Sequence, residues 1–88
     1  MTFIPTLLPP GEQSPRDCHV EAELSVVVTG TAWVETSDGV VAVDAGSAFL
    51  LEGGEAHTVH NRCEQPLVVF SAYWLPASAA SVAEVRSA

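Results

Sequence analysis

The sequence predicts an all-β domain, a small sandwich or barrel of about seven short strands. Val-rich runs alternate with Gly, Pro and Asp, which is typical of short antiparallel strands joined by turns. No segment before the C-terminal end has the apolar periodicity of a long helix. The Cys…Trp…Cys spacing of an immunoglobulin domain is absent.

Two strands are expected in the first third of the chain. Phe3 to Leu8 predicts an edge strand, limited by Pro5, and Pro9-Pro10 ends it. Leu24 to Thr29 is rich in β-branched residues and closes at Gly30.

The middle of the chain predicts a hairpin and one further strand. Thr31 to Thr36 and Val40 to Val43 flank Ser37-Asp38-Gly39, a tight-turn signal. The next turn is Ala45-Gly46, and the strand after it is Ser47 to Leu51.

The last two strands follow a second glycine turn, residues 52–55. They are Thr58 to Asn61 and Leu67 to Leu75, joined by a loop that ends at Pro66. We expect residues 1–76 to form a single domain, because 88 residues allow no more than one. The Ala/Ser-rich residues 77–88 predict a short irregular or helical tail.

The composition suggests that part of the surface is covered by a second subunit. Apolar residues make up 48% of the chain and charged residues only 16%, which is apolar for so small a domain. In the predicted strand, Leu24, Val26 and Val28 lie on one face and Val27 on the other, so both faces are apolar.

The charge, the length of the apolar runs and the cysteine spacing limit the partners and the cellular setting to be expected. A net charge of −8, with three Arg and no Lys, argues against nucleic-acid binding. No run approaches the ~20 apolar residues of a membrane span, and the N-terminus lacks the pattern of a secretory signal. Cys18 and Cys63 show no CxxC spacing, so a reduced, cytoplasmic setting is expected.

Four residues suggest a metal site: Asp17, His19, Glu23 and His57. Carboxylate and imidazole together are usual ligands of catalytic Fe(II), Mn(II) or Zn(II). On one continuous strand His19 and Glu23 would lie ~13 Å apart, too far to share an ion. We therefore expect either a turn at residues 20–22 that places Glu23 on the neighbouring antiparallel strand, or a helical bend there.

His57 must arrive from a distant strand, after a turn that Gly53-Gly54 permits. His57, Val59 and Asn61 then share a face, and His60 points the other way. We expect Asn61 to tie down the turn backbone.

The spacing of these residues resembles the cupin superfamily. The first cupin motif stands as Gly11, five residues, Asp17-Cys18-His19, three residues, Glu23, six residues, Gly30. The second motif stands as Gly46, five residues, Glu52-Gly53-Gly54, two residues, His57, three residues, Asn61. Fifteen residues separate the two motifs.

The resemblance implies a jelly-roll β-barrel, often a homodimer, with a metal held by His19, Glu23 and His57. Asp17 stands where the family usually has His, and Glu52 where it usually has Pro. The site can thus be Asp/His/Glu/His, a 2-His-1-carboxylate set without Asp17, or a degenerate site that binds no metal.

The function expected from the resemblance is metal-dependent chemistry on a small organic molecule. An oxygenase with Fe(II) is the first hypothesis; an isomerase, cyclase or lyase with Mn, Zn, Ni or Cu is the second. Glu21 or Tyr73 is a candidate for proton transfer, and Arg62 or Tyr73 for contact with substrate. The alternative is a non-catalytic module that binds a small molecule or a metal.

Overall fold

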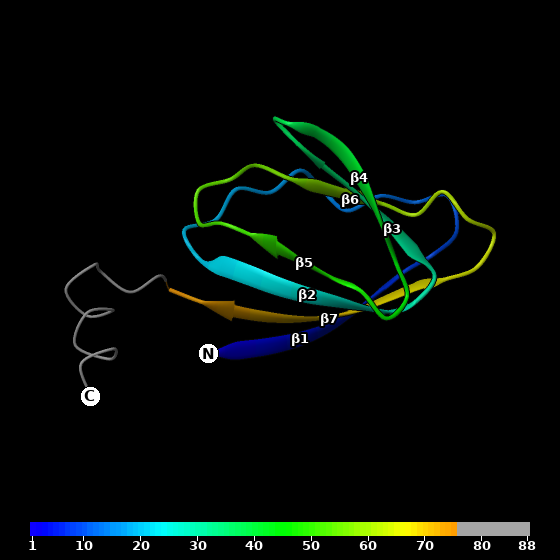
Figure 1. Ribbon diagram of the computed structural model, residues 1–88, viewed down its shortest axis with the longest axis horizontal. Coiled ribbons are helices and arrows are strands. Elements are labelled where there is room, and N and C mark those ends of the chain that lie inside the picture. The colour runs from blue at the N-terminus through cyan, green and yellow to red at the C-terminus, as the bar shows by residue number, and fades with distance from the viewer. Residues whose placement is uncertain (76–88) are drawn as a thin grey trace.

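The computed structural model describes residues 1–75 and shows seven strands in two antiparallel sheets (Figure 1). The strands are β1 (Thr2–Leu8), β2 (Ala22–Thr29), β3 (Thr31–Thr36), β4 (Gly39–Asp44), β5 (Ala48–Leu51), β6 (Thr58–His60) and β7 (Leu67–Trp74). One sheet has the order β1-β7-β2-β5 and the other the order β4-β3-β6. The predicted all-β barrel architecture is confirmed.

Every predicted strand is present, with ends that differ by no more than two residues. The Thr31–Thr36 strand has the predicted bounds, and its hairpin to β4 turns through Ser37 and Asp38. β1 is an edge strand paired only with β7, so Pro5 is tolerated there. The tail predicted at residues 77–88 lies outside the described residues.

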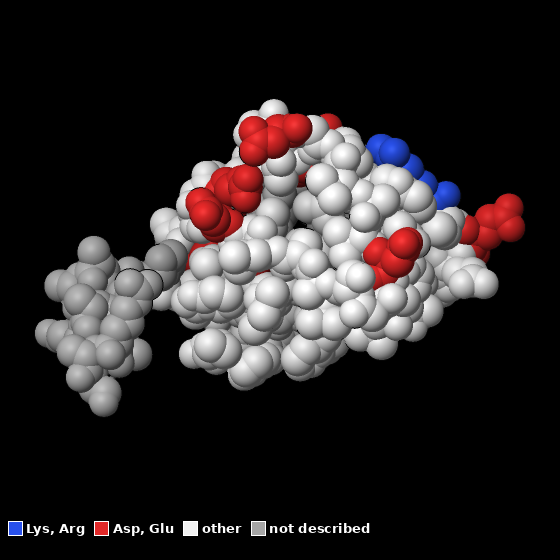
Figure 2. Space-filling model, viewed as in Figure 1, with Lys and Arg blue, Asp and Glu red and all other residues white. Residues whose placement is uncertain are grey.

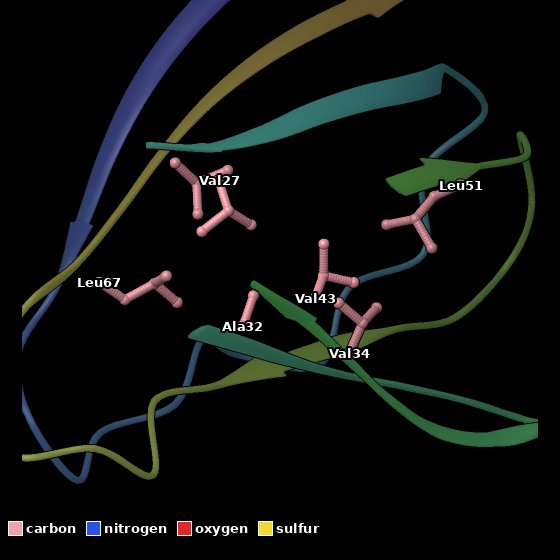
Figure 3. Close-up of a cluster of buried hydrophobic side chains, with 7 residues drawn as sticks. Val27, Ala32, Val34, Val43, Leu51 and Leu67 are labelled. Carbon is pink, nitrogen blue, oxygen red and sulfur yellow. The ribbon is translucent and has the colours of Figure 1, made fainter. Parts of the chain in front are cut away.

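The core lies between the two sheets and is aliphatic (Figure 3). Alternation along each strand sends one set of side chains inward, because successive residues of a strand point to opposite faces. The buried cluster consists of Val27, Ala32, Val34, Val43, Leu51, Leu67 and Val69.

The outer face of the four-stranded sheet is apolar and exposed. Leu24 pairs with Leu50 on one side, and Val26 pairs with Phe70 on the other. Paired residues share a face, so these side chains form one outward-facing patch. Each of them, and Phe3 beside Phe70, is at least 40% exposed. This is the strand face for which the sequence predicts a covering subunit.

Gly30, between β2 and β3, occupies a position that favours glycine for two reasons: its backbone conformation and the lack of space for a side chain. Its φ of +90° is one that L side chains rarely adopt. A Cβ at this position would lie 3.1 Å from the carbonyl oxygen of Pro66, so the loop before β7 packs directly on the turn. Among residues 1–75, no helix long and apolar enough to cross a membrane is found.

Candidate metal centre

His19, Glu23 and His57 lie together between the sheets. Each offers one ligand atom, and these three atoms lie within 4.8 Å of one another. Nε2 of His19 is 3.5 Å from Oε1 of Glu23, and Nε2 of His57 is 3.8 Å from the same oxygen. Ligand atoms bound to one ion at ~2.1 Å lie about 3.0–3.4 Å apart. A small inward movement of the side chains would therefore place all three on one metal ion.

The chain reaches this arrangement by crossing from one side of the barrel to the other. Asp17 forms an antiparallel bridge with His57, beside β6 of the three-stranded sheet. The chain then bends at Val20 and Glu21 and enters β2 of the four-stranded sheet. The predicted turn is present, but Glu23 does not lie on a neighbouring strand. It projects from the opposite sheet, which is why ligands four residues apart can face one another.

The two imidazoles are oriented by backbone carbonyls. Nδ1 of His19 lies 2.8 Å from the carbonyl oxygen of Glu21, and Nδ1 of His57 lies 3.1 Å from that of Glu55. A carbonyl only accepts hydrogen bonds, so each Nδ1 carries the proton and each Nε2 presents its lone pair. Two lone pairs and a carboxylate oxygen thus converge with no donor between them. This donor set fits a divalent cation.

Glu23 is held by a pair of buried serines that the sequence analysis missed. Ser25 Oγ donates to Oε2 of Glu23 at 2.5 Å and lies 2.7 Å from Ser71 Oγ. Because the Ser25 proton is used on Glu23, Ser71 must be the donor to Ser25. Both serines are almost fully buried. The available signal was a serine two residues after Glu23, on the same face of a strand that is otherwise apolar.

A cavity of about 190 Å³ adjoins the ligand cluster, with Glu23 and His57 in its wall. It lies between the sheets, and its wall combines apolar, hydroxyl and acidic side chains. The lining residues are Thr6, Leu8, Ser14, Pro15, Asp17, Glu23, Phe49, His57, Val59, Leu67, Val69, Ser71 and Tyr73. The ligand cluster is therefore open to a small molecule on one side.

Tyr73 lies beside the ligands. Its ring is edge-on to that of His19, with centroids 5.6 Å apart. Burial raises the pKa of the phenol, and the negative charge of Glu23 raises it further. Tyr73 therefore lines the cavity as a neutral hydroxyl at neutral pH.

The other predicted site residues are placed differently. Asp17 lines the cavity but is outside the three-ligand cluster, and its Oδ1 accepts a bond from the backbone N–H of Cys18. The side chain of Glu21 does not line the cavity, although its carbonyl holds His19. Arg62 stacks on Trp33, with its guanidinium carbon 5.7 Å from the ring centroid, and is also absent from the lining. Their proposed roles stay predictions.

Two other residues behave as the sequence predicted. Asn61 is 2% exposed and donates to the carbonyls of Leu8 and Gln65, so it ties the loop together. His60 points away from the ligands and pairs with Glu35 at 2.9 Å.

Comparison with known proteins identifies the fold. The family model described as Cupin domain matches residues 6–73. No curated protein matches the chain. A predicted oxalate decarboxylase from Thermotoga maritima is similar, with a TM-score of 0.78 and 24% identity over 84% of this chain and 65% of that one. A Cupin 2 conserved barrel domain protein from Salinispora arenicola has a TM-score of 0.76 and 24% identity over 97% of this chain and 69% of that one.

A third solved structure is a sugar phosphate isomerase of the cupin superfamily from Silicibacter pomeroyi. Its TM-score is 0.71, with 22% identity over 78% of this chain and 46% of that one. The chain thus spans less than two thirds of the length of the Thermotoga and Silicibacter proteins. At these identities the likeness shows a shared fold.

Proposed function

This chain belongs to the Cupin domain family, and we propose that it is a metal-dependent enzyme acting on a small organic molecule. The observation that carries the proposal is the convergence of two imidazole nitrogens and one carboxylate oxygen within 4.8 Å. The adjoining cavity supports it, because a small ligand could reach a bound ion there, and apolar side chains with a few polar groups line the space.

His19, Glu23 and His57 would hold the ion. Two histidines and one carboxylate, with positions left open, are typical of non-haem Fe(II) oxygenases, so Fe(II) is the favoured metal. Mn, Zn, Ni and Cu are the alternatives. When bound, the ion supplies a Lewis acid and open coordination positions beside the cavity.

An oxygenase is the first reaction class that we propose. The chain's own contribution is to position the substrate and to exclude water. Phe49, Val59 and Leu67 line the cavity next to the ligands, and such walls strengthen the electrostatic interactions inside the site. Ser25 fixes the carboxylate of Glu23 by holding one of its two oxygens, which leaves the other free to bind an ion.

An isomerase, cyclase or lyase is the second class, and the position of Tyr73 favours it. The neutral phenol lies at the cavity wall beside His19, where it can donate a proton to a substrate oxygen. The Silicibacter protein, which shares this fold, is described as a sugar phosphate isomerase, and this description supports the second class. Tyr73 is thus proposed both as proton donor and as substrate contact.

We further propose a homodimer that covers the outward-facing patch of Leu24, Val26, Leu50, Phe70 and Phe3. Large exposed apolar patches on small domains mark protein interfaces. A cytoplasmic location stays a prediction from the sequence.

Metal analysis combined with oxygen consumption tests the proposed function. Protein purified without chelator should contain one equivalent of a transition metal, and Fe(II)-loaded protein should consume O₂ in the presence of a turned-over substrate. Turnover without O₂ consumption would favour the isomerase or lyase. A metal-free chain whose stability is unaffected by chelators would favour the non-catalytic binding module.

A further inference from the structure

Building on the proposed function, we infer that the cavity takes small amphiphilic acids. The carboxylate head of such a ligand binds the metal ion, and its apolar tail, about the size of one ring, extends away from the ion along β7. The inference depends on the order of side chains along the cavity walls, on the position of the opening, and on the charges of the lining residues.

The wall formed by β7 changes from polar to apolar with distance from the metal ligands. Its lining residues, in order from the ligand end, are Tyr73, Ser71, Val69 and Leu67. They alternate along the strand, so they share one face over about 20 Å. Tyr73 pairs with Glu23, whereas Leu67 pairs with Leu8 at the other end. The polar end of this wall therefore lies at the ligands and the apolar end lies furthest from them.

The opposite wall runs in the same direction. Asp17 and His57 are bridged at the ligand end, and Val59 lies two residues further along the chain. Asn61, two residues beyond Val59, donates a hydrogen bond to the carbonyl of Leu8, at the apolar end. Both walls thus place polar groups near the ion and aliphatic groups away from it, which is the order of groups in an amphiphilic ligand.

Two hydroxyl groups lie between the two ends. Thr6 pairs with Val69, and the Oγ of Ser14 accepts a hydrogen bond from the amide of Val59, so both line the middle of the cavity. The proton of Ser14 remains available for donation. These hydroxyls can hydrogen-bond one polar substituent midway along a ligand. Leu8 and Leu67 offer no such group at the apolar end, so the tip of the tail must be apolar.

The cavity opens between the edges of the two sheets. β1 is an edge strand of one sheet, and residues 13–17 border the other through bridges to β6 and to His57. The exposed lining residues belong to these two segments and are Thr6, Pro15 and Asp17. Leu67, at the apolar end, is 1% exposed. A ligand thus enters from the side and removes its tail from water by turning it towards Leu67.

The volume limits the tail to about one ring. An engineered apolar cavity of about 150 Å³ holds benzene. The 190 Å³ here therefore accommodates a ring and a small head group. Phe49 and Val59, together with the two leucines of the far end, supply the apolar surface for the ring.

The lining supplies no cation, so an anionic head depends on the ion. Asp17 and Glu23 line the cavity, and no Arg or Lys is among the lining residues. Figure 2 shows several separate acidic side chains and a single group of basic ones on the visible face. A divalent ion held by two neutral imidazoles and one carboxylate keeps a net positive charge, so it is the partner that a ligand carboxylate needs. Without the ion, the head would meet negative charges only.

Four small molecules test the head and the tail separately. Acetate has the head alone, phenylacetate has both parts, phenylacetamide has a neutral head, and 1,4-phenylenediacetate carries a second charge on the tail. Dissociation constants are measured by amide chemical-shift titration of the full chain, loaded with Zn(II) and, in parallel, with chelator. Loaded protein should bind phenylacetate at least about tenfold more tightly than acetate or 1,4-phenylenediacetate, because only its ring is buried without a charge.

Removal of zinc tests whether the ion holds the head. Chelator should weaken phenylacetate binding at least about tenfold, and should affect phenylacetamide much less, because the amide carries no charge. Phenylacetate that binds equally with and without zinc would overturn the inference. So would acetate or 1,4-phenylenediacetate that binds as tightly as phenylacetate to the loaded protein.

The chemical shifts locate the tail on the parent protein. The ring of phenylacetate should shift the amides of Leu67 and Val69, which acetate should leave unshifted. Val59→Phe fills the cavity and should abolish the advantage of phenylacetate while acetate still binds. Val41→Phe, at a position on β4 that is 64% exposed, is the matched control and should keep that advantage. Unshifted amides at Leu67 and Val69, or a retained advantage in a folded Val59→Phe, would contradict the inference.

The two proposals fail in different ways. Zinc binding without a preference for phenylacetate over acetate would overturn the ligand class and leave the metal site standing. A chain that binds no zinc would remove the basis of the proposed enzyme, and the metal-bound head with it.

Discussion

Asp17 and His57 exchange two backbone hydrogen bonds, each 2.9 Å long, across forty residues of sequence. The pair fixes the segment that carries His19 against His57, which directly precedes β6. Paired residues share a face, so the side chain of Asp17 lines the same cavity as that of His57. This one bridge accounts for both the convergence of the histidines and the acidic character of the cavity wall.

Replacement of His57 by Ala should abolish stoichiometric metal binding. It removes one of three ligand atoms, so the loss of affinity should exceed the roughly 10–100-fold effect typical of a supporting residue. Zinc affinity measured by competition with a chromophoric chelator checks this. His60→Ala is the matched control, because His60 points outward to Glu35 and should leave zinc affinity unchanged. Equal affinities of the two variants would contradict the site.

Ser25→Ala should weaken zinc binding by about 10–100-fold, because Glu23 loses the group that fixes its orientation. The free energy of unfolding of the metal-free protein should also fall by about 1–3 kcal/mol, since buried polar atoms lose their partner. Ser71→Ala is the control. It should lower stability similarly but change zinc affinity less, because the Ser25–Glu23 contact remains. Matching effects on affinity would argue that Ser25 acts only through packing.

The titration of Tyr73 gives a pH test with no competing signal, because it is the only tyrosine in the chain. Absorbance at the phenolate band of the metal-free protein should show a midpoint above the usual ~10, and urea-unfolded protein should titrate near that usual value. Glu23→Gln should lower the midpoint of the folded protein by removing a negative charge. A folded midpoint at or below the unfolded one would show that the phenol is neither desolvated nor close to Glu23.

The same shift predicts how stability depends on pH. A folded-state pKa above the unfolded value means that the folded protein retains the phenol proton longer as pH rises. The unfolded state then binds fewer protons, so the free energy of unfolding falls as pH rises from the unfolded pKa towards the folded one. Tyr73→Phe should remove this contribution to the alkaline slope, which urea unfolding at a series of alkaline pH values measures.

Gly30→Ala should destabilise the protein more than Gly46→Ala. Both glycines have a φ near +90°, which costs an L residue about 1–3 kcal/mol. Only at Gly30 would the new Cβ also meet backbone, at 3.1 Å from the Pro66 oxygen, whereas at Gly46 there is open space. The difference in the free energy of unfolding between the two variants isolates this steric contact. No difference would mean that the 65–67 loop moves away without cost.

Val26→Arg should convert the proposed dimer into a monomer, because it places a charge in the middle of the outward-facing patch. Light scattering coupled to size exclusion at micromolar concentration reads out the mass. Val41→Arg, at an exposed position on the other sheet, should leave the mass unchanged. A monomeric parent protein would contradict the dimer directly.

The strands could be predicted because their signals are local. β-branched runs and glycine turns identify each one, and the edge position of β1 follows from Pro5. The ligands could be proposed because their spacing along the chain matches the two cupin motifs. The sheet to which Glu23 belongs could not be predicted from local signals. Strand pairing between β2, β5 and β7 joins segments up to about fifty residues apart.

The sequence by itself determined an all-β chain, an apolar strand face, and four residues with the chemistry of metal ligands, of which the structure brings three together. Only the tertiary structure decided that Ser25 and Ser71 hold Glu23, that Arg62 stacks on Trp33 away from the cavity, and that the cavity wall is acidic. The physical reason is that residue type and period are properties of a segment. Hydrogen-bond direction and local charge instead depend on which segments the two sheets bring face to face.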